Sequence, residues 1–400
     1  MSVNLDSVPC LKAGFSPRNG MRITIVIGPF LPVPPVLGGA VEKVHLLLAA
    51  AYRAAGHEVT IVSRRYKDFP GEEVVDGIRH LRIPSSDRRS SLAVNLVLDF
   101  IYSARAARML PAADVTVTNG FFQPLLLPRR RAGKIYVHVA RFPKGQMALY
   151  HRADRLQAIS RAVAEAIAVE APRLAGRLAS IGYPIPDAYF AADAAPRRRR
   201  TVLFVGRIAR EKGVHVLLRA FAQALADGAP AAPRDWTLRI VGPHEVSQGG
   251  DGREYLDELK AFARPLGPVC EFAGPVFDQN ALIAEYRAAS VFVYPSLAER
   301  GEAFGLAALE AMAAGCATIV SDLRCFDDFI EDGVTGLKFD HRGAEAAAAL
   351  AAQLARLTGE PQLLERIAEA GHRAACNFRT SVIAARMLQD FASLVGNRRP

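Results

Sequence analysis

Short apolar runs, each long enough for one β-strand, alternate with longer helical patterns along almost the whole chain. The first run, over residues 22–28, precedes a loop rich in Pro and Gly and then a helical pattern over residues 40–55. The same order begins again with an apolar run over residues 201–205. Parallel strands need crossover connections, which are usually helices, so this alternation predicts an α/β fold built on parallel sheets.

Each apolar run predicts one strand. In the first half of the chain these runs are residues 22–28, 59–63, 79–83, 114–118, 134–140 and 155–160. In the second half they are residues 201–205, 236–241, 269–273, 290–294 and 317–320.

An interruption of this pattern indicates two domains. Pro, Ala and charged residues replace it over residues 186–200, which we interpret as a linker. The 400 residues are enough for one domain on each side. We expect a loose N-terminal extension (1–20), Rossmann-like domains over 21–185 and 201–378, and a C-terminal helix (379–400) that can cross back to the first domain. The two domains would face each other across a cleft.

The segment that follows the predicted strand 290–294 places two carboxylates around the start of a helix. An Ala-rich apolar run beginning near Gly305 predicts that helix. Glu302 then lies in the loop before it, and Glu310 lies one to two turns inside it. Open α/β sheets bind their ligands beyond the carboxyl ends of their strands, where this loop is expected.

The expected geometry suits a particular kind of ligand. The free N–H groups and the positive dipole end of the helix would lie between the two acids. A nucleotide-sugar, with hydroxyl groups at both ends and a diphosphate in the middle, fits this arrangement. The alternative interpretation is structural, since acids near a helix N-terminus stabilise the helix dipole without any ligand.

A second motif, VGRIAREKG over residues 205–213, follows the first strand of the second domain. Arg207 and Lys212 are two cations that can neutralise a diphosphate, including the charge that develops on a departing nucleoside diphosphate. Arg210 is expected to face solvent. A surface loop with ordinary charges is the alternative interpretation.

Two further positions are candidates in the first domain. Gly38 and Gly39 join the first loop to the first helix, and glycine permits close approach of a phosphate or sugar to the backbone. A flexible turn explains them equally well. His138 ends an apolar strand whose carboxyl end should face the ligand, although a hydrogen-bonded core histidine is the alternative.

Charge is distributed unevenly along the chain. Residues 1–200 hold 29 Lys and Arg against 15 Asp and Glu, whereas residues 201–400 hold 21 against 25. A basic first half suggests an anionic surface or acceptor, such as peripheral contact with an anionic membrane. A solvated surface that aids solubility is the alternative. Nucleic acid is not expected as a partner, because aromatic residues do not interleave with the basic clusters.

Several sequence signals are missing. No apolar run approaches the roughly 20 residues that span a bilayer, and the best candidate, residues 92–102, is interrupted by Asp99. There is no secretory signal pattern, and the five scattered cysteines suggest reduced thiols. We expect a cytoplasmic protein, with the inner face of the membrane as a peripheral location. No Asp-x-Asp motif occurs, and no metal site is predicted.

On these motifs the chain resembles the retaining glycosyltransferases of family 4 (GT4, group 1), which have the two-domain GT-B fold. The resemblance spans about residues 21–395, and its most specific part is the Glu302-x7-Glu310 block. The other matching motifs are Gly38-Gly39, GHEV (56–59), VGR…EKG (205–213), RIVG (239–242) and DGVTGL (332–337).

The resemblance implies roles for the donor's nucleotide half. Arg207 and Lys212 would hold the diphosphate, and Glu310 would bind the ribose hydroxyls. Gly39, beside Gly38, would approach the phosphate.

It also implies roles at the transferred sugar. Glu302 would contact the sugar hydroxyls, together with the backbone N–H groups of Phe304, Gly305 and Leu306. His138 would face the sugar near the reaction centre, so that Glu302, His138, Arg207 and Lys212 form the expected catalytic set.

The resemblance implies retaining transfer of a sugar from a UDP-, GDP- or ADP-sugar to a hydroxyl acceptor on a glycan, glycolipid or small molecule. The pathway implied is synthesis of a cell-surface polysaccharide or glycoconjugate, with no metal and no other cofactor. The alternatives are a nucleotide-sugar epimerase or sugar phosphorylase on the same fold, or a non-catalytic, basic, membrane-associated scaffold. Two departures from the family pattern are an additional acid, Glu299, and the sequence YPIP (183–186) before the linker.

Overall fold

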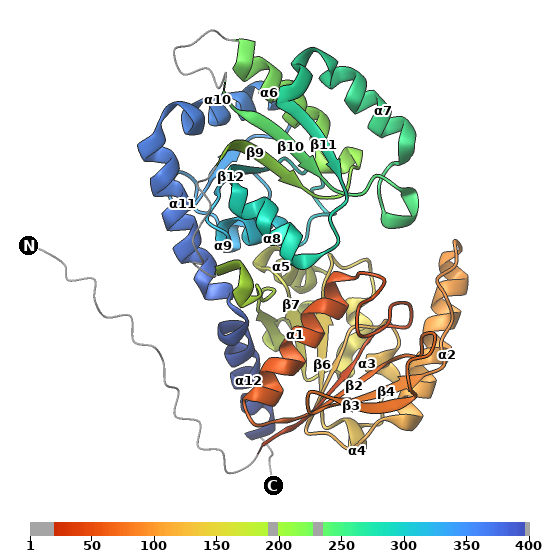
Figure 1. Cartoon of the computed structure of the whole chain (residues 1–400). Helices are drawn as coiled ribbons and strands as arrows, with labels where there is room; N and C mark the ends of the chain where they lie inside the picture. The colour runs from red at the N-terminus through yellow and green to blue at the C-terminus, as the bar shows by residue number, and fades with distance from the viewer. Residues whose placement is uncertain (1–19, 191–198, 227–234, 397–400) are drawn as a thin grey trace, which may run out of the picture.

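The computed structural model describes residues 20–190, 199–226 and 235–396. Within them, two mainly parallel sheets are covered by helices and form two domains (Figure 1). The predicted α/β class is therefore confirmed. Most of the expected extension (1–20) and part of the expected linker (186–200) lie outside the described residues.

The first sheet has eight strands in the order β3-β4-β2-β1-β5-β6-β7-β8. Only β3 runs antiparallel to its neighbour. The strands are β1 (Arg22–Val26), β2 (Glu58–Arg64), β3 (Glu72–Val75), β4 (Ile78–Ile83), β5 (Val115–Thr118), β6 (Lys134–Val139), β7 (Arg155–Ala158) and β8 (Leu178–Ser180). The helices of this domain are α1 (Ala40–Ala54), α2 (Leu92–Met109), α3 (Gln123–Leu126), α4 (Arg129–Ala132) and α5 (Arg161–Glu170).

The second sheet has six parallel strands in the order β11-β10-β9-β12-β13-β14. They are β9 (Arg199–Val205), β10 (Thr237–Val241), β11 (Cys270–Gly274), β12 (Ala289–Tyr294), β13 (Ala317–Ser321) and β14 (Leu337–Phe339). The remaining helices are α6 (Val214–Ala226), α7 (Gly252–Ala263), α8 (Gln279–Ala288), α9 (Leu306–Ala313), α10 (Ala346–Gly359), α11 (Pro361–Ala375) and α12 (Thr380–Gly396).

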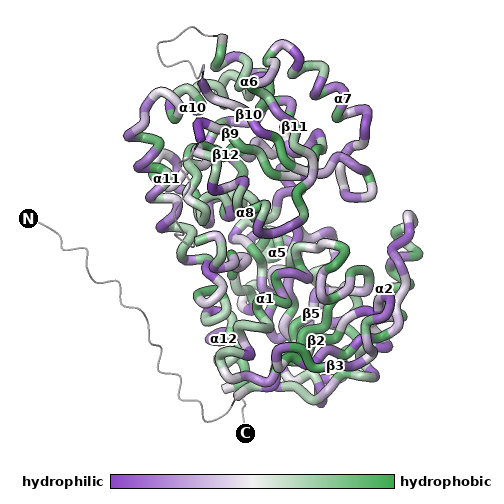
Figure 2. Tube along the Cα trace, in the orientation of Figure 1, coloured by the Kyte–Doolittle hydropathy of each residue, from purple (hydrophilic) through white to green (hydrophobic). Residues whose placement is uncertain are grey.

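Central strands of both sheets are apolar on both faces because helices cover both sides. Every residue of β12 and β13 is buried. Figure 2 shows hydrophobic colour along much of both sheets. Strands covered on both faces read as continuous apolar runs, which explains why they were predictable.

Three short strands were not predicted. β3 is a partly exposed hairpin strand at one edge of the first sheet, and β8 closes the other edge. β14, with only three residues, lies at the edge of the second sheet. Edge strands bury one side or less, so they leave no long apolar run in the sequence.

The last helix, α12, packs against the first domain beside α1 (Figure 1). Phe391 is fully buried, with its ring 5.7 Å from that of Tyr52 and 4.8 Å from that of Tyr136. The Tyr136 hydroxyl donates to Asp390 at 2.9 Å, and Arg155 pairs with the same carboxylate at 2.7 Å. The C-terminal helix thus completes the core of the first domain.

Replacing Phe391 with Ala should lower the free energy of unfolding by about 3–5 kcal/mol, because it leaves a cavity between two buried tyrosines. Urea denaturation followed by circular dichroism measures this change. Gln389→Ala, on the exposed face of α12, is the matched control and should change stability little. An unchanged midpoint for Phe391→Ala would mean that α12 does not pack here in solution.

Candidate active site

The loop between β12 and α9 ends in a glycine that the backbone requires. Gly305 precedes α9 with a φ of 76°, in the left-handed region. A Cβ at this position would also overlap the ring of Phe326. In the part of the chain that the structure describes, the backbone N–H groups of Phe304, Gly305 and Leu306 donate to no acceptor. The start of α9 therefore offers unpaired donors and the positive end of a helix dipole.

Lys212 and Glu302, which are 90 residues apart, form a buried ion pair. The Lys212 ammonium donates to Glu302 Oε2 at 2.6 Å, and the side chains are 7% and 10% exposed. The Lys212 Nζ also lies 5.5 Å from the centre of the Tyr294 ring. The N–H of Leu297 donates to the carbonyl of Glu211 at 2.8 Å, which joins the two loops directly. The structure thus brings together two of the predicted site residues.

Arg207 lies just beyond β9, at the same edge of the sheet. Its guanidinium donates to Glu211 at 2.8 Å and to the carbonyl of Gly249 at 2.5 Å. The Arg207 side chain remains 42% exposed, so it can reach a ligand. Arg210 is more exposed and forms an ion pair with Glu258 at 2.7 Å.

Glu310 lies on α9, where the side chains of two tyrosines meet it. The Tyr286 hydroxyl donates to Glu310 Oε2 at 3.0 Å, and Tyr189 also forms a side-chain hydrogen bond with Glu310. Burial raises the pKa of Glu310 to about 7, and the tyrosines and the charge of Lys43 partly oppose this rise. Lys43 belongs to α1 of the first domain, so this carboxylate is influenced by both domains.

Glu299, the additional acid of the loop, has other partners. Its carboxylate accepts from His341 Nε2 and from Arg342 Nε, each at 3.0 Å. Glu302 is therefore the acid of this loop that pairs with Lys212.

His138 is a buried histidine at the end of β6. The Gln157 amide nitrogen donates to the Ile181 carbonyl, which leaves Gln157 Oε1 to accept from His138 Nδ1–H. His138 Nε2 then lies 3.4 Å from the Tyr183 hydroxyl. Burial lowers the pKa of His138 to about 4, so the imidazole is neutral near pH 7.

Tyr183 links this histidine to the second domain. Its ring lies 5.6 Å from the Phe304 ring, directly before the N-terminus of α9. Among the described residues, the polar partners of His138 are Gln157 and Tyr183 and not Glu302, Arg207 or Lys212, so its role at the sugar stays a prediction.

Gly38 and Gly39 both have positive φ angles, of 81° and 104°. A Cβ on Gly39 would overlap the carboxylate of Glu42, a buried acid in the first turn of α1. Burial raises the pKa of Glu42. The positive φ angles therefore favour glycine at both positions, and contact with a phosphate stays a prediction.

Sequence reasoning missed Tyr189, Tyr286 and Lys43 around Glu310. Tyr189 lies in the segment expected to be a linker, and Tyr286 looks like an ordinary residue of a helix. Only the packing of α8 and of the turn at Asp187–Phe190 against α9 brings the two tyrosines to the Glu310 carboxylate.

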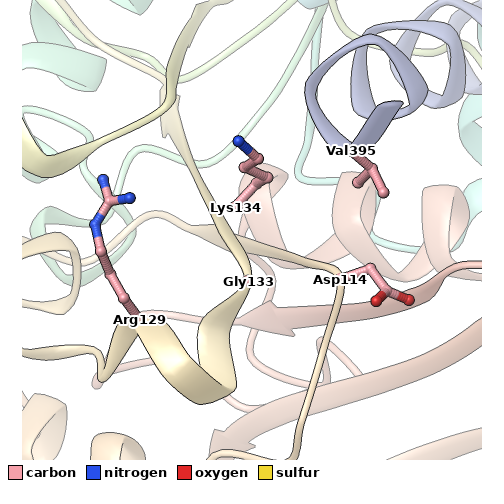
Figure 3. A pocket seen from close by; sticks show the side chains of 5 residues that line it. All are labelled: Asp114, Arg129, Gly133, Lys134 and Val395. Carbon is pink, nitrogen blue, oxygen red and sulfur yellow. The ribbon is translucent and has the colours of Figure 1, made fainter. Parts of the chain in front are cut away.

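Two cavities lie away from these residues. One, of about 230 Å³, is lined by Asp114, Arg129, Gly133, Lys134 and Val395 (Figure 3). Asp114, Gly133 and Lys134 lie at the amino ends of β5 and β6, the opposite edge of the sheet from the carboxyl ends. The other, of about 660 Å³, is lined by residues 327–331, Thr335, Ala374, Asn377, Phe378 and Arg386. None of the predicted site residues lines either cavity.

Comparison with known proteins identifies relatives. Residues 187–374 match the family model described as glycosyl transferases group 1. The phosphatidyl-myo-inositol mannosyltransferase of Mycolicibacterium smegmatis is 29% identical over 421 residues, covering 94% of this chain and 95% of that protein.

Solved structures share the fold. Sucrose-phosphate synthase from Thermosynechococcus elongatus matches with a TM-score of 0.71 at 22% identity, covering 94% of this chain and 99% of that one. The Anabaena protein Alr3699/HepE, in complex with UDP and glucose, matches with a TM-score of 0.69 at 16% identity, covering 93% and 100%. At these identities the likeness establishes the fold alone.

The raised pKa of Glu310 predicts that the difference in stability between the wild type and Glu310→Gln depends on pH. The folded protein holds a proton on Glu310 up to a pH of about 7, whereas the unfolded chain loses it near the ordinary glutamate value. The stability that Glu310 contributes is therefore lost as the pH rises between these two values. Glu310→Gln should melt close to the wild type at low pH and at a higher temperature than the wild type above pH 7.

Differential scanning fluorimetry across this pH range measures the effect. Glu365→Gln, on the exposed face of α11, is the control and should track the wild type at every pH. A constant difference between Glu310→Gln and the wild type would contradict the assigned pKa.

Proposed function

Since the chain is a member of the group 1 glycosyltransferases, with the GT-B fold, we propose that it transfers a sugar with retention from a nucleoside-diphosphate sugar to a hydroxyl acceptor. The observation that carries this proposal is the buried Lys212–Glu302 pair beside the unpaired N–H groups at the start of α9. Such a site offers a fixed cation in Lys212 and a fixed carboxylate in Glu302 that can accept hydrogen bonds from sugar hydroxyls. The oriented N–H dipoles at the start of α9 belong to the same loop region. UDP-, GDP- and ADP-sugars are the candidate donors, and no cofactor is required in this proposal.

In the proposed complex the diphosphate lies between Arg207 and Lys212. Arg207 presents a half-exposed guanidinium held by Glu211 and Gly249, which fixes its direction before a donor arrives. Negative charge builds on the diphosphate as the bond to the sugar breaks. A preorganised cation stabilises that charge without reorganisation during the reaction.

Glu302 has a different task in this proposal. Its pairing with Lys212 keeps the carboxylate in place, and its remaining lone pairs accept hydrogen bonds from sugar hydroxyls. The N–H groups of Phe304, Gly305 and Leu306 donate to the sugar or to the diphosphate. Positioning by several fixed groups, rather than proton transfer by Glu302, then sets the geometry of the reaction.

Glu310 binds the ribose hydroxyls in the same proposal. The hydroxyls of Tyr286 and Tyr189 hold the carboxylate from the protein side. Two ribose hydroxyls that donate to it favour the ionised form, which opposes the effect of burial.

The proposed mechanism has no covalent nucleophile: the acceptor hydroxyl attacks the sugar on the face from which the diphosphate departs, the bond between sugar and diphosphate breaks, and the hydroxyl proton passes to the departing diphosphate. His138 contributes as a neutral imidazole, because its pKa of about 4 keeps it unprotonated near pH 7. With Nδ1–H donated to Gln157, Nε2 is the accepting nitrogen, and the Tyr183 hydroxyl lies 3.4 Å from it. His138 is therefore assigned to positioning of the sugar and not to acid catalysis.

We place the reaction in the synthesis of a cell-surface polysaccharide or glycoconjugate, at the cytoplasmic side of the membrane. A relative named for mannosyl transfer to phosphatidyl-myo-inositol supports a lipid-linked acceptor. Epimerase, phosphorylase and scaffold functions are disfavoured by the family, whose described activity is glycosyl transfer.

Nucleotide binding provides the first test. The nucleoside diphosphate of the correct base should raise the melting temperature of the wild type but not of Arg207→Ala. Loss of charge-assisted hydrogen bonds of about 1.5–3 kcal/mol corresponds to roughly ten- to hundredfold weaker binding. Arg210→Ala, which removes an exposed arginine of the same loop, should bind like the wild type. No shift with UDP, GDP or ADP would sink the donor-site assignment.

The products provide the second test. Incubation with candidate donor sugars, followed by NMR of the first product formed, should show the anomeric configuration of the donor. Lys212→Ala should lower kcat by a large factor, on the order of a hundredfold for removal of one preorganised charge. An inverted product would overturn the retaining mechanism while leaving glycosyl transfer intact.

A further inference from the structure

The loop between β12 and α9 contains a tight turn that begins at Ala298. The N–H groups of Gly301 and Glu302 both donate to the Ala298 carbonyl, at 3.1 and 3.0 Å. The turn therefore holds the backbone of Glu302, whose side chain pairs with Lys212. A contact that fixes this turn also fixes the carboxylate of Glu302.

One side chain of the turn, that of Glu299, reaches other elements. Among the described residues, the polar contacts that residues 298–301 make outside their own loop are all contacts of the Glu299 carboxylate. Its Oε1 lies 3.0 Å from His341 Nε2 and 3.0 Å from Arg342 Nε. Both partners belong to the loop after β14. We call these two contacts of Glu299 the loop anchor.

The histidine of the loop anchor is a rigid partner. The His341 side chain is 3% exposed, and its Nδ1 has no hydrogen-bond partner among the described residues. A proton on Nδ1 would be buried without an acceptor, so we assign the ring proton to Nε2, which donates it to Glu299. Because buried side chains are closely packed, the direction of this N–H is fixed before Glu299 meets it.

The arginine of the loop anchor is held by groups on both sides of it. The Arg342 guanidinium donates to the Asp322 carbonyl at 3.0 Å, and the Arg342 backbone N–H donates to Asp340 Oδ1 at 3.0 Å. The side chains of Arg342 and Glu299 are 50% and 55% exposed. An ion pair at this exposure adds little to stability, so we look for its effect in geometry instead.

Sheet order explains why these groups meet. β12, β13 and β14 are neighbours, and the loops after them carry Glu299, Asp322 and Arg342 in the same order. On the other side of β12 lies β9, and the loop after β9 carries Lys212. Glu302 is thus supported from two sides, by Lys212 directly and by the loop anchor through the turn.

We propose that Glu299, His341 and Arg342 are positioning residues for the transferred sugar. They hold the turn so that the Glu302 carboxylate accepts hydrogen bonds from the sugar hydroxyls in one geometry. A displacement of about 1 Å in such a site can lower the rate by about a hundredfold. This inference rests on the proposed function, which assigns Glu302 to the sugar, and it deepens that function by naming the residues that set the position of Glu302.

The loop anchor should not affect the nucleotide half of the donor. In the proposed complex Arg207 binds the diphosphate and Glu310 binds the ribose, and neither side chain contacts the loop anchor. Loss of the anchor should therefore lower kcat and leave the affinity for a nucleoside diphosphate unchanged. General destabilisation of the second domain would weaken both.

Two substitutions of Glu299 in the full chain test the proposal. Glu299→Ala removes both hydrogen bonds and should lower kcat by about ten- to a hundredfold. Glu299→Gln retains an oxygen that can replace Oε1, which accepts both hydrogen bonds, so it should turn over close to the wild type. The donors are UDP-glucose, GDP-mannose and ADP-glucose. UDP, GDP or ADP should raise the melting temperature of both variants as much as that of the wild type.

Hydrogen exchange of the same proteins reports on the turn without any substrate. The amides of Gly301 and Glu302 should exchange about tenfold faster in Glu299→Ala, because local opening of the turn becomes easier. They should exchange at the wild-type rate in Glu299→Gln. Glu331→Ala, which removes an exposed acid of the same domain, is the matched control and should change neither exchange nor kcat.

The outcomes separate this inference from the proposed function. Unchanged exchange in Glu299→Ala would overturn the loop anchor, and faster exchange with unchanged kcat would overturn its role in positioning. An equal loss of kcat in Glu299→Gln would assign the effect to the charge of Glu299 and also overturn the proposal. If UDP, GDP and ADP all fail to stabilise the wild type, the donor site and the role at the sugar both fall, while exchange still tests the anchor itself.

Discussion

The buried contact between Lys212 and Glu302 is the interaction around which the rest of the second domain's site is arranged. Removing two charges from water is expensive, and their attraction compensates only when the geometry is close. That geometry requires β9 and β12 to be neighbours in the sheet, so that the loops after them meet. The hydrogen bond from Leu297 to Glu211 closes the same junction through the backbone. Sheet order, and not sequence proximity, therefore assembles this pair.

Much of this was readable in the sequence because alternation of strands and helices predicts a parallel sheet, whose strands all end at the same edge. The apolar runs around residues 201–205 and 290–294 revealed two strands, and the polar residues directly after them had to lie at one edge. The choice of Glu302 over Glu299 also came from spacing, and the structure gives the two acids different partners. Continuous burial, as in β12, leaves a strong signal in the sequence.

Other features could not be predicted because they depend on contacts between distant elements. Nothing near Tyr189 or Tyr286 in the sequence indicates that both meet Glu310. The polar residues of α2 lie on its buried face, where the Asp99 carboxylate accepts from the backbone N–H groups of Phe121 and Phe122. In the sequence that aspartate looks like an interruption of an apolar run, whereas in the structure it determines which face of the helix is buried.

The position of α12 has a consequence for how the chain folds during synthesis. The first domain comes off the ribosome early, but the side chain that fills the space between Tyr52 and Tyr136 is Phe391. Translation must therefore pass residue 391 before the first domain has its full core, by which time the second domain has already been made. A nascent first domain keeps an uncovered apolar patch throughout this interval, which is the situation in which chaperones bind folding intermediates. The first domain can complete its core only when α12 has been made.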